Sequence, residues 1–338
     1  MATNVLGTIT GSTGMGRYFT VVSALPSASF VSYVYLLVES GAWSGPVRFD
    51  EALRGIDLKA GVLLTLVSFA AAVTLHPLQF ALIQLLEGYW GRSTIARRLA
   101  ALRVLHHQRV TARLDRETEN GTWSADAHAA ETVIRQREAK RLRESYPTEL
   151  DDILPTRLGN VLRRYEMSGG SPYGIDLIAT APRISMVAQD RELQYVADQR
   201  TQLELAVRVA VLAMIAAMAT VVVLWRHGAW LLLAIGPYTV AYLAYRGAVV
   251  AAHEYGTALT VMVELNRFAL YERLHLKLPD SLEAEKHLNP GIMRLLRSKH
   301  PITDRDSPYR HPDPAPSVFP PGISSGRGST ASTADRVE

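Results

Sequence analysis

The chain has 338 residues, of which 48% are hydrophobic, and its formal net charge is +4. It contains no cysteine, which excludes disulfide bridges, thiolate metal sites and cysteine nucleophiles. This charge is too small to indicate nucleic-acid binding, so no nucleic-acid partner is expected. Apolar blocks before residue 88 and between residues 205 and 252 alternate with charged segments, a distribution typical of a membrane protein.

Two predicted spans lie in the first apolar block. Residues 18–38 carry no charge and are long enough to cross about 30 Å of hydrocarbon, and Pro26 predicts a kink within them. Residues 60–83 form the second span, with His76 and Pro77 near its far end. An ionisable residue inside a span is a functional candidate by default. His76 can also bond a backbone carbonyl that Pro77 frees, and we favour this structural interpretation.

A long charged connector follows the second span. It holds 18 Arg and Lys residues between positions 89 and 204, so the positive-inside rule places it in the cytoplasm. Apolar residues recur three to five positions apart over residues 95–114, which predicts a basic amphipathic helix that lies on the inner leaflet or packs on the domain. A second charged helix is expected over residues 125–145, with Glu131 and Arg135 spaced to form a solvent-facing ion pair, and we interpret it as a spacer.

The most distinctive sequence of the connector is LPTRLGNVLRRYE at residues 154–166. It is followed by Gly169 and Gly170, by YGID at residues 173–176, and by Pro182 with Arg183. Gly159 inside a helical run costs about 1 kcal/mol relative to Ala, which predicts close approach by another element. Gly174 is expected to adopt a positive φ. We predict that residues 154–183 form the folded centre of the cytoplasmic domain. The candidates for binding a partner or ligand are Arg157, Asn160, Glu166, Asp176 and Arg183.

This segment resembles one found in a family of multi-pass bacterial membrane proteins, which pair an LPTRLGN stretch with YGID and then Pro-Arg. The resemblance extends to EGYWG at residues 87–91 and to LNRFALYERL at residues 265–274. The family pattern has an aromatic residue before Pro-Arg, where this chain has Ala181. The resemblance implies a bacterial membrane location and brings no activity, cofactor or catalytic residue with it.

The second apolar block predicts spans at residues 209–225 and from residue 229 to 245 or 252. Only Arg226, His227 and Gly228 separate them, so they must form a tight antiparallel hairpin. Arg208 is expected to extend its charged end to the membrane surface. A helix is expected to continue over residues 258–276, with a polar stripe that pairs with Arg157, Arg163 and Asp176.

The sequence therefore predicts an all-α membrane protein with four transmembrane helices, a mainly helical cytoplasmic domain between spans two and three, and a C-terminal cytoplasmic helix. Its predicted segments are an N-terminal cytoplasmic tail (1–17), spans one and two (18–88), the cytoplasmic domain (89–204), the hairpin of spans three and four (205–252), a cytoplasmic helical segment (253–300) and a disordered tail (301–338). Of the 36 basic residues 31 are Arg, which together with the resemblance favours a bacterial inner membrane with both termini in the cytoplasm.

Tests for catalytic motifs give negative results. His253-Glu254 lacks the second His that a zinc protease places four residues after the first, because position 257 is Thr. No phosphate-binding glycine loop occurs, and the GxSxG match at residues 322–326 lies in the predicted disordered tail rather than between a strand and a helix, where a nucleophile elbow would form. We expect no cofactor, no metal and no catalytic residue, and we interpret the adjacent His106 and His107 as surface residues.

Three functions remain open. The first is an integral membrane scaffold, sensor or assembly module whose cytoplasmic domain binds a protein partner. The second is a pore or small transporter formed by a homo-oligomer, for which Pro26, His76 and the Gly236-Pro237 pair are the motivation. The third is a membrane-bound enzyme with a scattered cytoplasmic site around Arg157, Asn160, Glu166 and Asp176.

The predicted topology can be tested with reporter fusions. Fusions after Arg116 and after Pro301 should report a cytoplasmic location, and a fusion near Gly45 should report an external one, because the Arg-rich connector sets the orientation. An external signal after Arg116 would contradict the topology.

Overall fold

The computed structural model describes residues 19–43, 45–119 and 127–298. Within these residues every regular element is a helix, and no strand is present. The predicted N-terminal tail (1–17) and the predicted disordered tail (301–338) lie outside the described residues. The all-α fold class is confirmed for the part of the chain that the structure describes.

In the part of the chain that the structure describes, four helices are long and apolar enough to cross a membrane, as predicted. They are α2 (Leu25–Glu39), which continues the π-helix η2 (Phe19–Ala24); α4 (Leu58–Leu75); α10 (Asp190–Leu224); and α11 (Ile235–Arg273), which follows the 3-10 helix η5 (Gly228–Ala234). The short helix α3 (Phe49–Arg54) joins α2 to α4. Only residues 225–227 separate α10 from η5, so the predicted tight hairpin is confirmed.

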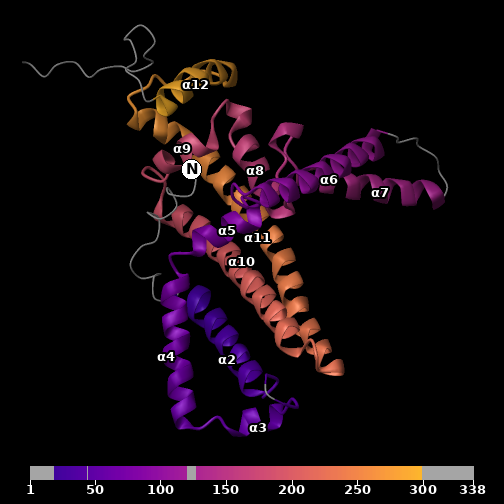
Figure 1. Cartoon of the computed structure of the whole chain (residues 1–338). Helices are drawn as coiled ribbons and strands as arrows, with labels where there is room; N and C mark the ends of the chain where they lie inside the picture. Colours follow the sequence, from indigo (N-terminus) through magenta and orange to yellow (C-terminus); the bar gives the residue numbers. More distant parts are fainter. Residues whose placement is uncertain (1–18, 44, 120–126, 299–338) are drawn as a thin grey trace, which may run out of the picture.

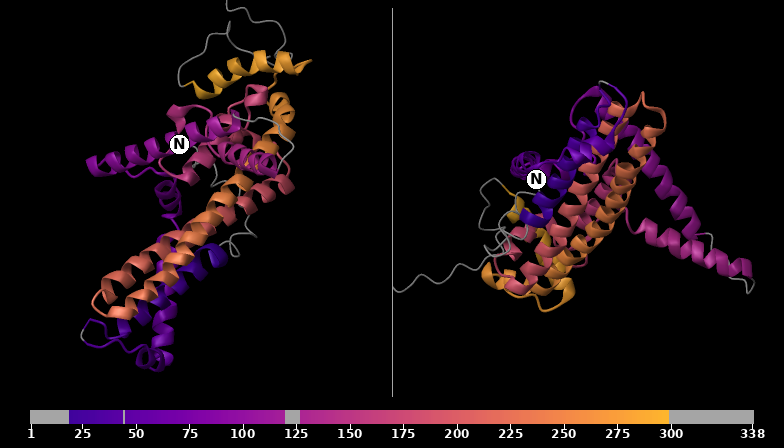
Figure 2. Two further views of the ribbon diagram at one scale, coloured as in Figure 1. Left: turned by 90° about the vertical axis from the view of Figure 1, so that its right-hand side faces the viewer. Right: turned by 90° about the horizontal axis from the view of Figure 1, so that it is seen from below.

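The apolar parts of these helices lie side by side in a row. α4 packs on α2, α2 packs on α10, and α10 packs along α11 (Figure 1). The two ends of the row, α4 and α11, lie on opposite sides of the molecule, and Figure 2 shows the same order from a second direction. Large apolar side chains such as Leu58, Leu66 and Phe69 of α4 are exposed in the isolated chain. One chain therefore forms an open layer of helices.

The second predicted span, residues 60–83, is wrong as a single helix. α4 ends at Leu75, and the separate helix α5 (Gln79–Glu87) begins after a turn. Pro77 causes the interruption, because it has no N–H to donate and its ring clashes with the preceding helical turn. Pro26, in contrast, lies in the first turn of α2, where a missing N–H is tolerated.

α10 and α11 continue well past their apolar parts, over 35 and 39 residues in total. Three further helices surround their polar ends: α8 (Arg157–Ser168), α9 (Leu177–Ile184) and α12 (Leu282–Arg297). Two 3-10 turns, η3 (Leu150–Asp152) and η4 (Ser171–Tyr173), join them to their neighbours. We call this assembly of α8, α9, α12 and the polar ends of α10 and α11 the cap, and its end of the molecule the cap side (Figure 1).

One hydrophobic core holds the cap together. Leu158 of α8, Ile184 of α9, Met262 of α11 and Ile292 of α12 are each at least 98% buried and belong to the same cluster. Each such side chain contributes about 1.5–3 kcal/mol when it is fully buried. The cluster also reaches Ile83 of α5, so the core is continuous from the interrupted span to the cap.

Side-chain caps fix where the cap helices begin. Thr156 accepts a hydrogen bond from the backbone N–H of Gly159, Asp176 from that of Ala179, and Ser281 from that of Ala284. Each bond satisfies a helix N–H that has no intrahelical acceptor, which is worth about 1 kcal/mol.

The connector helices α6 (Thr94–Glu119) and α7 (Ala127–Arg143) form an antiparallel pair that projects from the bundle, which we call the arm (Figure 2). Leu114 and Ala139 form a small core between them with Tyr146. The predicted pair of Glu131 and Arg135 is confirmed at 2.5 Å. His107 was wrongly predicted to lie on the surface: it is buried, and its Nδ1 lies 3.1 Å from the Tyr146 hydroxyl.

The motif segment of α8 docks on the end of α5. Thr156 Oγ1 donates a 2.6 Å hydrogen bond to the Leu86 carbonyl. A Cβ atom added to Gly159 would overlap the carbonyl oxygen of Glu87, and one added to Gly88 would press on the ring of Pro155. The close approach predicted from Gly159 is confirmed, as is the positive φ of Gly174, which is 69°.

Replacing Gly159 should therefore weaken the docking of α8. We expect Gly159→Ala to destabilise the protein by about 1–3 kcal/mol, because the overlap with Glu87 outweighs the gain in helix propensity. Thermal unfolding in detergent measures this. The control is Gly291→Ala in α12, where a Cβ atom meets no neighbour within 4 Å and the melting temperature should stay the same or rise. Equal melting temperatures for the two variants would contradict the docking role.

Candidate functional site

Polar side chains gather where the apolar parts of α4 and α10 end on the cap side. Arg208 of α10 is fully buried, and its Nε donates a 2.7 Å hydrogen bond to Gln79 Oε1 of α5. Its Nη2 lies 3.4 Å from the Leu75 carbonyl at the end of α4. Gln79 Nε2 in turn donates to the Glu204 carbonyl at 2.9 Å. We call this group of Gln79, Glu204 and Arg208 the junction.

The break after α4 explains why the junction forms here. The last carbonyls of a helix have no intrahelical donor, and they carry the negative end of the helix dipole. The Arg208 guanidinium meets the Leu75 carbonyl at that end. The prediction that Arg208 extends to the membrane surface is wrong, because a buried amide and a carbonyl hold its side chain inside the protein.

The predicted intramembrane candidate His76 lies in the same break. Its Nδ1 is 3.3 Å from the hydroxyl of Ser23 in η2. This contact ties the start of the first span to the end of the second one. His76 is therefore an intramembrane polar residue that joins two candidate spans.

Buried polar groups continue from the junction toward the cap. Glu204 is 99% buried and pairs with Arg200 at 2.7 Å. Tyr255 of α11 is also buried, and its hydroxyl has no hydrogen-bond partner within the described residues. An unpartnered buried hydroxyl is rare in native structures.

Two carboxyl groups with raised pKa values belong to α5 and α8, which pack on each other. Burial raises the pKa of Glu87 to about 7, and the nearby charge of Glu166 contributes to this rise. The pKa of Glu166 is also raised by burial, although Arg163 opposes the shift. Arg163 forms ion pairs with Asp152 at 2.5 Å and with Glu166 at 3.4 Å. The predicted candidate Glu166 thus influences the pKa of Glu87, which was not among the predicted candidates.

Asn160 has a structural position. Its side chain is fully buried, where Oδ1 accepts from the Leu154 N–H at 2.7 Å and Nδ2 donates to the Leu154 carbonyl at 2.9 Å. These two hydrogen bonds close the turn that leads into α8. Arg157, at the start of the same helix, is exposed.

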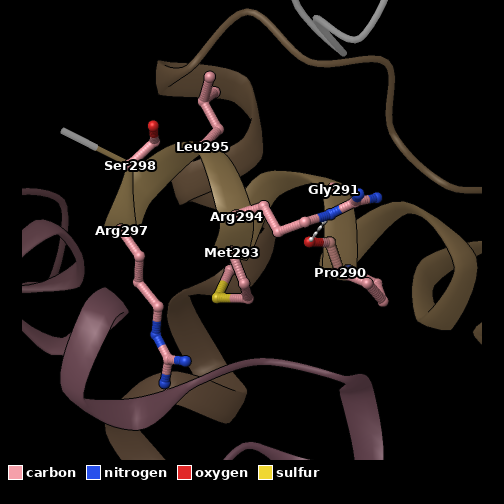
Figure 3. Close-up of a pocket in the computed structure, with 7 residues that line it drawn as sticks. All are labelled: Pro290, Gly291, Met293, Arg294, Leu295, Arg297 and Ser298. Carbon is pink, nitrogen blue, oxygen red and sulfur yellow. Dashed lines mark hydrogen bonds between the residues drawn. The ribbon is translucent and has the colours of Figure 1, made fainter. Parts of the chain in front are cut away.

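Asp176 and Arg183 connect α9 to α12. Asp176 caps α9 and forms an ion pair with Arg297, and Figure 3 shows Arg297 reaching from α12 toward the neighbouring ribbon. Arg183 donates to the Leu296 carbonyl at 3.3 Å. The predicted pairing of Arg163 and Asp176 with the polar stripe of residues 258–276 is wrong, since their partners lie in residues 152–166 and in α12.

The polar stripe itself binds α12 through a network that the sequence analysis missed. Tyr271 donates to Glu285 Oε1 at 2.9 Å, and Arg267 pairs with the same carboxylate at 3.0 Å. Asn289 Nδ2 donates to the Tyr173 carbonyl at 2.6 Å. Glu285 and Asn289 are four residues apart and therefore lie on one side of a helix. This spacing was the feature of the sequence that could have indicated the network.

A hollow of about 700 Å³ lies beside the end of α12 (Figure 3). Its described lining comes entirely from residues 290–298, including Met293, Arg294 and Arg297. In the described part of the chain no group of three or more His, Asp or Glu side chains is placed to hold a metal ion. The hollow is open and one-sided, so we do not assign the site to it.

The Glu87 carboxyl predicts a specific pH dependence. Its folded pKa of about 7 lies above the ordinary glutamate value of 4.5, so the folded state keeps a proton that the unfolded chain releases. The stability that Glu87 contributes is therefore present below pH 4.5 and is lost as the pH rises through 7. Glu87→Gln stays neutral, so its melting temperature should fall less than that of the unmodified protein between pH 5 and pH 8.

The matched control is Glu138→Gln, because Glu138 is exposed on the arm. This variant should reproduce the pH profile of the unmodified protein. Parallel profiles for Glu87→Gln and the unmodified protein would contradict the raised pKa.

The junction lies at the cap-side end of the candidate membrane-spanning helices, and the half-buried Glu87 and Glu166 lie on α5 and α8. These groups can hold a proton, order water and fix the angle between the helices. Comparison with protein-family models, with curated proteins and with solved structures finds no match for this chain.

Proposed function

We propose that this protein is an integral membrane scaffold or assembly module of the bacterial inner membrane, and that its cap lies in the cytoplasm and binds a protein partner. The observation that carries the proposal is the continuity of α10 and α11, which pass without a break from the apolar row into the core of the cap. A module built in this way holds a cytoplasmic surface at a fixed orientation to the bilayer. A signal sensed by such a module would pass between the bilayer and the cap through α10 and α11.

The orientation is supported by aromatic residues at both ends of the row. Trp225 and Trp230 are exposed at the hairpin turn, and Trp43 is exposed after α2. Tyr89 is exposed at the other end, after α5. Aromatic residues favour the two membrane surfaces. The Arg-rich connector leaves the row at the Tyr89 end, which favours the cytoplasm for the cap and for both termini.

The surface around the start of α8 is the best place for the partner. Arg157 is exposed there and lies next to the docked end of α5. Asn160 and Asp176 hold the backbone of the cap in position, so we assign them an indirect part in binding. A fixed backbone under an exposed Arg favours recognition, because less side-chain and loop freedom is lost when the partner binds.

A pore or small transporter is the second candidate, and the open row favours it. Four helices in a row enclose no channel within one chain, whereas several copies joined through α4 and α11 would surround one. His76 would then lie near the cap-side end of that channel. The enzyme hypothesis has no such support, because Asn160 and Asp176 are occupied by separate structural contacts.

Purification in a mild detergent and measurement of the particle mass separate these functions. The scaffold predicts a complex with a different protein at fixed stoichiometry, and Arg157→Ala should abolish this complex without changing the melting temperature. The matched control is Arg137→Ala, an exposed residue of the arm, which should leave the complex intact.

Two outcomes would overturn the proposal. A ring of identical copies without another protein would favour the pore. Retention of the partner by Arg157→Ala would show that the surface at the start of α8 is not where the partner binds.

A further inference from the structure

The first half of α6 carries an exposed apolar stripe. Ile95, Leu99, Leu102 and Leu105 are 74%, 51%, 64% and 48% exposed. Their spacing of three and four residues places them on one side of the helix. Four large apolar side chains in one line are far more than the scattered exposed residues of an ordinary surface.

The stripe is separate from the side of α6 that contacts the rest of the arm. Val110 and Leu114 pack against Ala139 and Tyr146, and His107 bonds to Tyr146. At 100° per residue, this contact side lies about a third of a turn from the stripe. The packing of α7 on α6 therefore leaves the stripe uncovered in the described part of the chain.

The charge around the stripe has a single sign. No acidic residue occurs between Gly88 and Leu114, whereas six Arg residues do. At 100° per residue, Arg103 lies about 40° beyond the Leu99 edge of the stripe, and Arg98 lies between Leu102 and Leu105, about one turn before Leu102. An apolar stripe bordered by Arg is the pattern of a helix that lies in the surface of an anionic bilayer, where long basic side chains reach the lipid phosphates.

The fold brings this helix to the bilayer surface. α6 begins seven residues after α5 ends, and the exposed belt residue Tyr89 lies between them. Figure 1 shows α6 leaving the end of the apolar row and running across the direction of α10 and α11. A helix tied to the end of a span and directed sideways has lipid headgroups as its nearest large surface.

We propose that α6 is a second membrane-binding element, which inserts the stripe of Ile95, Leu99, Leu102 and Leu105 into the leaflet on the cap side and binds anionic phospholipid headgroups through Arg98 and Arg103. It fixes the arm against the bilayer while the cap stays free to bind a partner. This inference does not depend on the proposed function, since a scaffold and a pore would both use it.

The absence of cysteine makes the test direct. The full chain carries a single cysteine in place of Leu102, is labelled with an environment-sensitive fluorophore and is reconstituted in vesicles of phosphatidylcholine with phosphatidylglycerol. We expect a lipid that carries a quencher on its acyl chain to quench this label at least about twofold more than a label in the Ala101→Cys control, which lies about 100° around the helix. Aqueous iodide should show the reverse order. Both labelled proteins must unfold at the temperature of the unlabelled chain.

The lipid charge is tested in the same vesicles. Removing phosphatidylglycerol, or introducing Arg98→Gln together with Arg103→Gln, should reduce quenching of the Leu102→Cys label by the acyl-chain quencher. Equal quenching in neutral and anionic vesicles would overturn the role of the headgroup. Full access of iodide to the Leu102→Cys label, or its protection by a second copy of the chain or by another protein rather than by lipid, would overturn the proposal.

Discussion

The buried guanidinium of Arg208 is the constraint on which the arrangement of the other elements depends. Removing a charged group from water costs several kcal/mol unless hydrogen bonds compensate for it. Compensation here comes from Gln79 and from the carbonyl of Leu75, and both are available only because the helix breaks at Pro77. The break therefore does more than end a span: it frees the Leu75 carbonyl, which a continuous helix would have bonded internally, and it is followed by Gln79, whose side chain is the second acceptor.

The same break positions the cap. Because α5 starts anew after Pro77, it can lie against α10 and present Glu87 and Gly88 to the segment that follows the arm. Because Gly159 has no side chain, α8 fits closely against that surface at this position. The neighbouring Leu158 side chain enters the common core. The row of apolar helices and the cap are thus two parts of one packing unit, joined by contacts that tolerate little change in volume.

The sequence was sufficient for features that depend on local composition or on backbone conformation. Uncharged stretches identified the four membrane helices, and the unusual glycine at position 159 correctly indicated close approach. The pairing of Asp176 with Arg297 was not predictable, because it joins residues more than a hundred positions apart and each has ordinary surface chemistry in the sequence. Arg208 was misinterpreted for a related reason. Its acceptor Gln79 lies in α5. The sequence suggested that α5 was part of the second span, because it did not show that Pro77 breaks that helix.

The position of α12 in the chain has a consequence for biosynthesis. The apolar sides of α8 and α9 are completed by Met262 of α11 and by Ile292 of α12, which are synthesised much later than α9. At typical rates of translation, on the order of ten seconds pass between the emergence of α9 and that of α12. During this interval only the first two spans, which precede the connector in the chain, have been made. The core around α8 and α9 is still incomplete. The core of the cap can therefore close only after the second hairpin and α12 have been synthesised.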